Sequence, residues 1–203
     1  MNKTIIQIGS HVGDTCNDPI FNTIDDATTI ILVEPVPFLF EQLMHNYKSK
    51  YPNNPNIFFI NKAASNFIGE IELTIPSERN DFSKLPFWAS QLASVDPNHA
   101  TSHLYELLVD KITVQTTTLN QIVEEYGITH IDLLHTDTEG HDYTILMDYD
   151  FRVKPMKIMF EHKHMDGFLQ VGTKYEELSE RLFSLGYKFI SLNTEDTIFE
   201  LDI

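Results

Sequence analysis

The feature that most constrains the fold of this chain is a repeated alternation of short apolar runs with segments of helical character. Apolar, β-branched runs cover residues 5–8, 29–33 and 57–60, and turn residues bound them. Strands buried on both faces of a parallel sheet have this composition and length. Residues 38–47 lie between two of these runs and carry apolar side chains at helical spacing. The pattern therefore predicts a doubly wound, mostly parallel α/β sheet.

The alternation returns in the second half of the chain. Apolar runs at residues 131–134 and 156–160 predict two more buried strands. Residues 175–185 form an amphipathic pattern, which predicts a helix that Gly186 closes. Residues 189–192 and 197–201 then predict a terminal antiparallel hairpin.

Local signals predict three further helices. Thr118 is placed as an N-cap, with Gln121 as its capping-box partner, and Gly127 is placed to end that helix. The other two helices are expected at residues 19–26 and 142–147.

Residues 70–117 interrupt this pattern and predict an inserted hairpin and loop. Residues 70–75 alternate polar and apolar side chains, as in a strand with one wet face, and residues 112–117 can return as its partner. Residues 76–103 predict a long loop, which inside a compact domain is usually functional or disordered. Its aromatic side chains suit either a lid over a site or simple packing of the loop: Phe82, Phe87 and Trp88.

Length and composition limit the classes of protein. The 203 residues suit one domain over residues 1–203, and the single cysteine, Cys16, forms no internal disulfide. The formal net charge of −16 disfavours nucleic acid as a partner, because phosphates are repelled. No apolar run approaches the roughly 18 residues of a membrane span, and no long apolar leader opens the chain. We therefore expect a cytoplasmic protein with no membrane partner. The sequence does not predict its oligomeric state.

The first turn and the end of the second strand point to a nucleoside ligand. The first strand leads into Gly9-Ser10-His11-Val12-Gly13-Asp14, where glycine allows a tight turn beside a ligand. A dinucleotide fingerprint would require glycine at positions 11 and 14, so a pyrophosphate site is poorly supported. Glu34 ends the second strand, where a carboxylate can accept both hydroxyls of a ribose.

Five runs occur in the order found in FkbM-type methyltransferases, which the chain resembles from about residue 5 to 190: IIQIGSHVGD, ILVEP, INKAASNFIGEIEL, TTTLNQIVEEYGITHIDLLHTDTEG and PMKIMFEHKH. The segment IDLLHTDTEG resembles the family hallmark most specifically. The resemblance implies a class I methyltransferase (Rossmann-like) fold with S-adenosylmethionine as methyl donor and S-adenosylhomocysteine as product. It also implies a hydroxyl of a sugar or small metabolite as acceptor.

The resemblance also implies which residues hold the cofactor. Glu34 would hold the ribose, Ala64 and Ser65 would lie by the adenine, and four first-turn residues would line the methionine part: Gly9, Ser10, His11 and Gly13. Three positions depart from the family pattern. Gln7 stands where an acid is usual, His11 where asparagine is usual, and His135 where lysine is common.

The segment after the fourth buried strand carries two acids, Asp137 and Glu139. Ligands of open α/β sheets bind at the carboxyl ends of the strands. On an extended segment these two side chains would face the same side. We expect Asp137 to lie near the acceptor and to take its hydroxyl proton, with Glu139 beside it. The alternative is that one of them caps the following helix.

Glu161, His162, Lys163 and His164 follow the fifth buried strand. On an extended chain the two histidines would share one face, with Glu161 and Lys163 on the other. Glu161 is expected to shape the acceptor site, and His162 or His164 is a candidate general base. With Asp137 and Glu139 these histidines could also form a metal site.

We nevertheless expect no bound metal, because the spacing lacks a signature such as two histidines four apart on a helix. The other histidines, including His99, His103 and His130, are expected to be isolated surface residues.

Two other functions remain open. One is a nucleotide-dependent oxidoreductase on a similar sheet, against which the incomplete dinucleotide fingerprint counts. The other is a catalytically silent binding module, which the departures at Gln7, His11 and His135 keep open.

Overall fold

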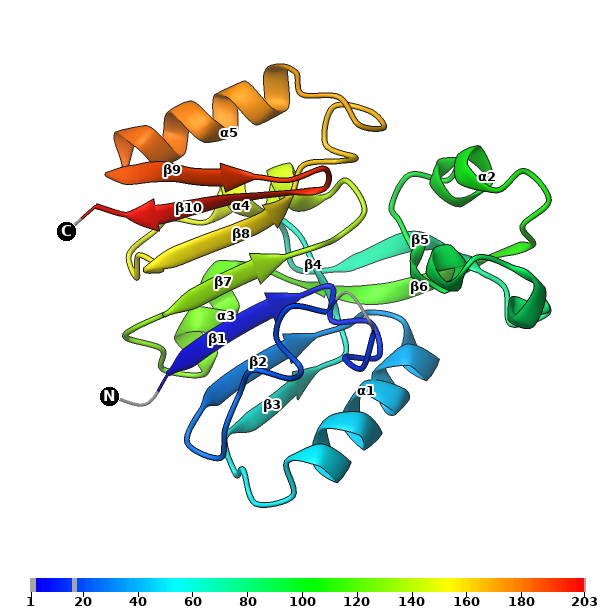
Figure 1. The fold of residues 1–203 in the computed structure, drawn as a ribbon, viewed down its shortest axis with the longest axis horizontal. Helices are drawn as coiled ribbons and strands as arrows, with labels where there is room; N and C mark the ends of the chain where they lie inside the picture. Colours follow the sequence, from blue (N-terminus) through cyan, green and yellow to red (C-terminus); the bar gives the residue numbers. More distant parts are fainter. Residues whose placement is uncertain (1–2, 16–17, 203) are drawn as a thin grey trace.

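A seven-stranded sheet forms the centre of the computed structural model, which describes residues 3–15 and 18–202 (Figure 1). The strand order is β3-β2-β1-β7-β8-β10-β9. The strands are β1 (Thr4–Ile8), β2 (Thr29–Val33), β3 (Ile57–Ile60), β7 (Leu133–Thr136), β8 (Lys157–Glu161), β9 (Tyr187–Leu192) and β10 (Asp196–Leu201). Neighbours from β3 to β8 are parallel, whereas β10 is antiparallel to both β8 and β9. The prediction of a mostly parallel sheet with a terminal hairpin is confirmed.

The central strands are mostly apolar because both faces of the sheet are covered. In β1, Ile5 and Ile6 are both fully buried, but they belong to separate apolar clusters. Successive side chains of a strand point to opposite faces. Ile5 packs on the face of α1 (Pro37–Lys50), while Ile6 packs on the opposite face. That face is covered by α3 (Leu119–Glu125), α4 (Asp142–Asp148) and α5 (Thr173–Ser184).

The predicted helix start at Thr118 is confirmed, although only half of the capping box forms. Thr118 Oγ1 accepts a hydrogen bond from the Gln121 backbone N–H at 3.0 Å. The Gln121 side chain does not complete the box, since its Oε1 accepts from Thr117 Oγ1 at 3.1 Å. Gly127 follows the helix with a φ of 59°, a left-handed conformation that favours glycine.

The predicted helix at residues 19–26 is wrong, because that segment is a series of turns. Asp18 Oδ1 accepts from the backbone N–H groups of Ile20 and Phe21, at 2.8 and 2.6 Å. Thr28 Oγ1 donates to Asp25 Oδ1 at 2.7 Å and closes a second local turn. Such side-chain bonds compete with helical hydrogen bonding. Cys16 lies outside the described residues.

The insertion is a second small sheet beyond the carboxyl ends of the main strands (Figure 1). Strand β6 (Val109–Thr117) pairs antiparallel with β5 (Glu70–Pro76) and parallel with the short β4 (Ala63–Ala64). The connecting segment holds η1 (Phe82–Lys84), η2 (Phe87–Gln91) and α2 (His99–His103).

The connecting segment has its own small apolar cluster. Leu92, Ala100 and Leu107 are its buried members, and Trp88 packs against it. Phe87, by contrast, is 67% exposed. Trp88 therefore packs the connecting segment, whereas Phe87 projects into solvent. Among the helices of the described residues, none has the length and apolar character required to cross a membrane.

Candidate functional site

A pocket opens at the carboxyl ends of β1, β2 and β7, where the insertion closes one side. Its lining includes most of the residues predicted for the cofactor and acceptor: Gly9, Ser10, His11, Glu34, Ala64, Asp137 and Glu139. The insertion contributes Gln91 and Ser94 among others. The parallel strands thus bring segments distant in sequence to one edge of the sheet.

Gly9 holds the first turn tightly against the end of β7. Its φ is 80°, and a Cβ atom there would lie 1.7 Å from the carbonyl oxygen of Asp137. The backbone N–H groups of Gly9 and Ser10 both donate to the Val33 carbonyl, at 3.0 and 3.1 Å. Only glycine permits this approach of two strand ends.

Gly13 has a different environment from the one that the family resemblance implies. A Cβ there would lie 2.5 Å from the ring of Tyr47 on α1. Within residues 3–15 and 18–202, the pocket lining does not include it. Gly13 thus packs the first turn against α1.

Glu34 is buried at the pocket and fixed by two backbone donors. Its Oε2 accepts from the His11 N–H and its Oε1 from the Val36 N–H, each at 2.8 Å. Burial raises the pKa of Glu34 to about 7, although both hydrogen bonds oppose the shift. Since each carboxylate oxygen has a further acceptor position, Glu34 can still accept hydroxyl donors from a ligand.

A carboxylate lies beside Gln7 even though position 7 itself is not acidic. Gln7 Nε2 donates to Asp18 Oδ2 at 2.6 Å, and both side chains line the pocket. Gln7 Oε1 is buried and has no hydrogen-bond partner among the residues that the structure describes. Sequence reasoning missed Asp18 because its position depends on the turn that replaces the expected helix.

The other two departures are neutral histidines, of which His135 is buried and His11 is half-buried. Burial lowers the pKa of His11 to about 4, and its Nε2 lies 3.3 Å from the Ser90 carbonyl oxygen of the insertion. Burial also lowers the pKa of His135 to about 4. Both residues line the pocket, and Nδ1 of each lacks a hydrogen-bond partner in the described part of the chain.

The buried His135 predicts a specific acid sensitivity. Its pKa is lowered from 6.5 in the unfolded chain to about 4, so the unfolded chain binds the proton more readily between these values. The stability that neutral His135 contributes is fully present above pH 6.5, and it is lost as the pH falls from 6.5 to about 4. From pH 7 to 5, wild type should lose about 2 kcal/mol more unfolding free energy than His135→Gln. Urea unfolding at both pH values measures this, and equal losses would contradict it.

The chain turns sharply after β7, so the expected extended segment is wrong. Glu139 has a φ of 52° and Gly140 a φ of 100°. Asp137 and Glu139 nevertheless both line the pocket. The alternative that one of them caps α4 is also wrong, because the N-cap position is His141 and has no side-chain cap. Burial, together with the charges of Glu161 and Glu139, raises the pKa of Asp137 well above its usual value.

The chain also turns after β8, which brings Glu161 and His164 together. His164 Nδ1 lies 2.8 Å from Glu161 Oε1 and 3.0 Å from Glu139 Oε2. The expectation that Glu161 and Lys163 share one face of an extended chain is therefore wrong. Lys163 Nζ pairs with Glu195 at 2.7 Å. Burial tends to raise the pKa of Glu139, but hydrogen bonds from two histidines outweigh it and lower that pKa.

His162 is not brought to the pocket. Its Nδ1 lies 3.0 Å from Thr197 Oγ1, and its ring packs edge-on against Tyr175. Ser65 likewise lies behind the pocket lining, where its Oγ is 3.0 Å from Nε2 of His141. His141 itself lines the pocket, and its position next to the hallmark segment was the available signal for it.

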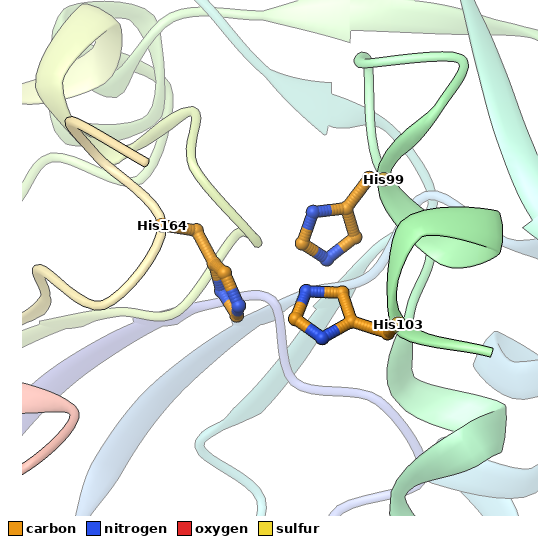
Figure 2. Close-up of side chains that lie close together, drawn as sticks. All are labelled: His99, His103 and His164. Atoms are coloured by element: carbon orange, nitrogen blue, oxygen red, sulfur yellow. The ribbon is translucent and has the colours of Figure 1, made fainter. Parts of the chain in front are cut away.

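His99 and His103 are not isolated surface histidines, as the sequence analysis expected. They stand four residues apart on α2, and their rings face His164 (Figure 2). His99 Nε2 lies 2.7 Å from Glu139 Oε2. The structure thus contains two histidines four apart on a helix, which the sequence does not predict because residues 76–103 have the pattern of a loop. His130 pairs instead with Asp132 at 3.2 Å and is partly exposed.

Comparisons with known proteins agree with this architecture. The family model of the methyltransferase FkbM domain matches residues 7–189. Methyltransferase FkbM from Methylobacillus flagellatus has a similar fold, with a TM-score of 0.55 at 11% identity over 98% of this chain and 43% of that chain. Fibrillarin, a pre-rRNA processing protein from Methanococcus jannaschii, gives a TM-score of 0.50 at 12% identity over 98% of this chain and 66% of its own.

At these identities the structural likeness concerns the fold alone, and this chain spans less than half of the Methylobacillus protein. No curated protein matches the sequence. The family model, however, covers nearly the whole chain. The seven-stranded sheet with its antiparallel hairpin is the class I methyltransferase fold, and the chain belongs to the FkbM methyltransferase family.

Proposed function

We propose that this chain is an S-adenosylmethionine-dependent methyltransferase that methylates a hydroxyl group of a sugar or small metabolite. The observation that carries the proposal is the fixed carboxylate of Glu34 in the same pocket as Asp137, with the Gly9 turn between them. The family supports methyl transfer as the reaction. The choice of a hydroxyl group as the acceptor goes beyond the family match and is part of the proposal.

The lining of the pocket supports S-adenosylmethionine as the ligand. Glu34 is oriented by two N–H groups and offers acceptors for ribose hydroxyls, while Ala64 leaves an apolar surface for a base. The Asp18 carboxylate, held by Gln7, would attract the ammonium group of the methionine part. Neutral His11 would line the same part without repelling it.

The acceptor would approach along the side of Asp137 and Glu139. The cofactor supplies an electrophilic methyl group when bound. In its ionised form Asp137 would take the hydroxyl proton as the oxygen attacks, because its carboxylate lines the pocket beside the reaction site. Glu139, fixed by His99 and His164, and Glu161 behind His164 would shape this side of the pocket.

The net charge of −16 supports a neutral or cationic acceptor rather than a nucleic acid. The proposal places the reaction in the cytoplasm, which the single cysteine supports. No observation favours an oxidoreductase, because positions 11 and 14 are not glycine.

Calorimetric titration with S-adenosylhomocysteine tests the donor site. We expect micromolar binding by the wild type, and Glu34→Ala should weaken it by about tenfold or more. The control is Glu41→Ala, an exposed acid on α1 that should leave the affinity unchanged. Because Glu34 also anchors the first turn, thermal unfolding of each variant must show a folded protein. Equal affinity of folded Glu34→Ala and wild type would exclude Glu34 from the cofactor site. Failure of the wild type to bind would favour a silent binding module.

A further inference from the structure

We propose that His99, His103 and His164 form a binding site for a divalent transition metal of the zinc class at the edge of the acceptor pocket. Two chain segments build this histidine cluster (Figure 2). Helix α2 of the insertion provides His99 and His103, whereas the turn after β8 provides His164. Residues four apart on a helix share one face, so α2 presents both imidazoles to the turn.

The distances suit a single ion. The ring centroids lie 4.8 Å apart for His99 and His103, 4.6 Å for His99 and His164, and 5.0 Å for His103 and His164. One ligand nitrogen from each residue lies within 4.8 Å of the others. Tetrahedral bonds of about 2.1 Å would bring these nitrogens to about 3.4 Å from one another. Small side-chain rotations supply this change.

The hydrogen bonds leave His164 with a free nitrogen. Its Nδ1 lies between the carboxylates of Glu161 and Glu139, at 2.8 and 3.0 Å. Its Nε2 is buried and, within residues 3–15 and 18–202, has no hydrogen-bond partner. Metal-binding histidines commonly donate one ring N–H to a carboxylate and bind the ion through the other nitrogen. His164 is therefore arranged as a metal ligand already oriented by its neighbours.

A purely ionic cluster explains less of the arrangement. A protonated His164 between two carboxylates would account for both ion pairs. It would also account for His99, whose Nε2 pairs with Glu139, but not for His103, whose ring faces the other two imidazoles. Protonated forms of His99 and His103 would repel His164. A metal ion explains all three rings, and the buried carboxylates of Glu139 and Glu161 would balance its charge.

The ligand types select the metal. Imidazole nitrogen suits zinc, cobalt, nickel, copper and iron, whereas magnesium and calcium prefer oxygen ligands. Three histidines are typical of a zinc-class site that keeps its fourth position open. Glu139, which pairs with His99 and His164, also lines the pocket, so the ion would lie where the acceptor enters. If the proposed function holds, a bound ion can orient an acceptor oxygen and ease loss of its proton.

Metal titration tests the site without any methyl acceptor. The tag-free protein is stripped with a chelator and titrated with zinc by calorimetry and with cobalt by visible absorption. We expect one ion per chain and the cobalt d–d bands of tetrahedral nitrogen ligation. The double variant His99→Ala/His103→Ala should weaken zinc binding by about a hundredfold or more. His130→Ala, a partly exposed histidine that pairs with Asp132, is the matched control and should bind as the wild type does.

Two results would overturn the site: no zinc binding by the wild type at millimolar concentration, or equal binding by the folded double variant. If the double variant does not fold, His103→Ala alone replaces it, since His103 is only partly buried and must likewise weaken zinc binding. S-adenosylhomocysteine binding is measured on the same metal-free samples. Failure of the metal site and failure of the cofactor site are therefore read separately.

Discussion

Replacement of Gly9 by alanine should abolish cofactor binding and destabilise the protein by about 2–5 kcal/mol. The new methyl group would lie 1.7 Å from the Asp137 carbonyl oxygen, and the φ of 80° disfavours any side chain. The backbone of β1 or β7 would have to shift. Because His11 and Asp137 flank this contact, the pocket would change together with the fold. Urea unfolding measures the stability, and calorimetry with S-adenosylhomocysteine measures the binding.

Gly127→Ala is the matched control for Gly9→Ala. Gly127 also has a positive φ, of 59°, but a Cβ there would meet nothing within 4 Å. Its cost should be limited to the left-handed conformation, about 1–2 kcal/mol, with unchanged cofactor affinity. Similar losses for the two variants would show that the close approach of β1 and β7 has no special importance.

Replacement of Asp137 by asparagine should slow methyl transfer by about 10²–10⁴-fold. Asparagine keeps the size of the side chain but cannot take a proton from the acceptor. Affinity for S-adenosylhomocysteine should stay close to that of wild type, because Glu34 and the first turn are untouched. Transfer of a labelled methyl group to a neutral acceptor found by screening measures the rate.

Asp202→Asn serves as the control for Asp137→Asn. Asp202 is exposed and pairs with Lys188 at 3.2 Å, beside the last strands of the sheet. Its rate should equal that of wild type. A folded Asp137→Asn variant with the wild-type rate would exclude Asp137 as the proton acceptor.

The main sheet could be predicted from the sequence because its strands are buried on both faces. Residues 30–33 of the run at 29–33 are all apolar and all buried, as that explanation requires. Glycine marked the turns equally well, since Gly127 and Gly186 both have positive φ after helices. These signals are local, and a single sequence contains them.

The failures depend on side chains that redirect the backbone. Asp18 binds two N–H groups and replaces a helix by turns, which also places its carboxylate beside Gln7. The turns after β7 and β8 put Glu139 and Glu161 around His164, whereas an extended chain would have separated them. Spacing along the sequence does not reveal such turns.

The histidine cluster required tertiary information of another kind. His99 and His103 have helical spacing, but the sequence does not show that residues 76–103 fold back onto the turn that holds His164. The small sheet of β5 and β6 places α2 there. Candidate sites on insertions are therefore harder to predict than those at the ends of central strands.

The most direct test of the account is a crystal structure of this protein grown with S-adenosylhomocysteine. The account predicts that the ribose hydroxyls contact Glu34, that the amino group lies near Asp18, and that the sulfur atom lies on the side of Asp137. Ligand bound elsewhere, or bound in this pocket with its ribose away from Glu34, would contradict the proposed cofactor site.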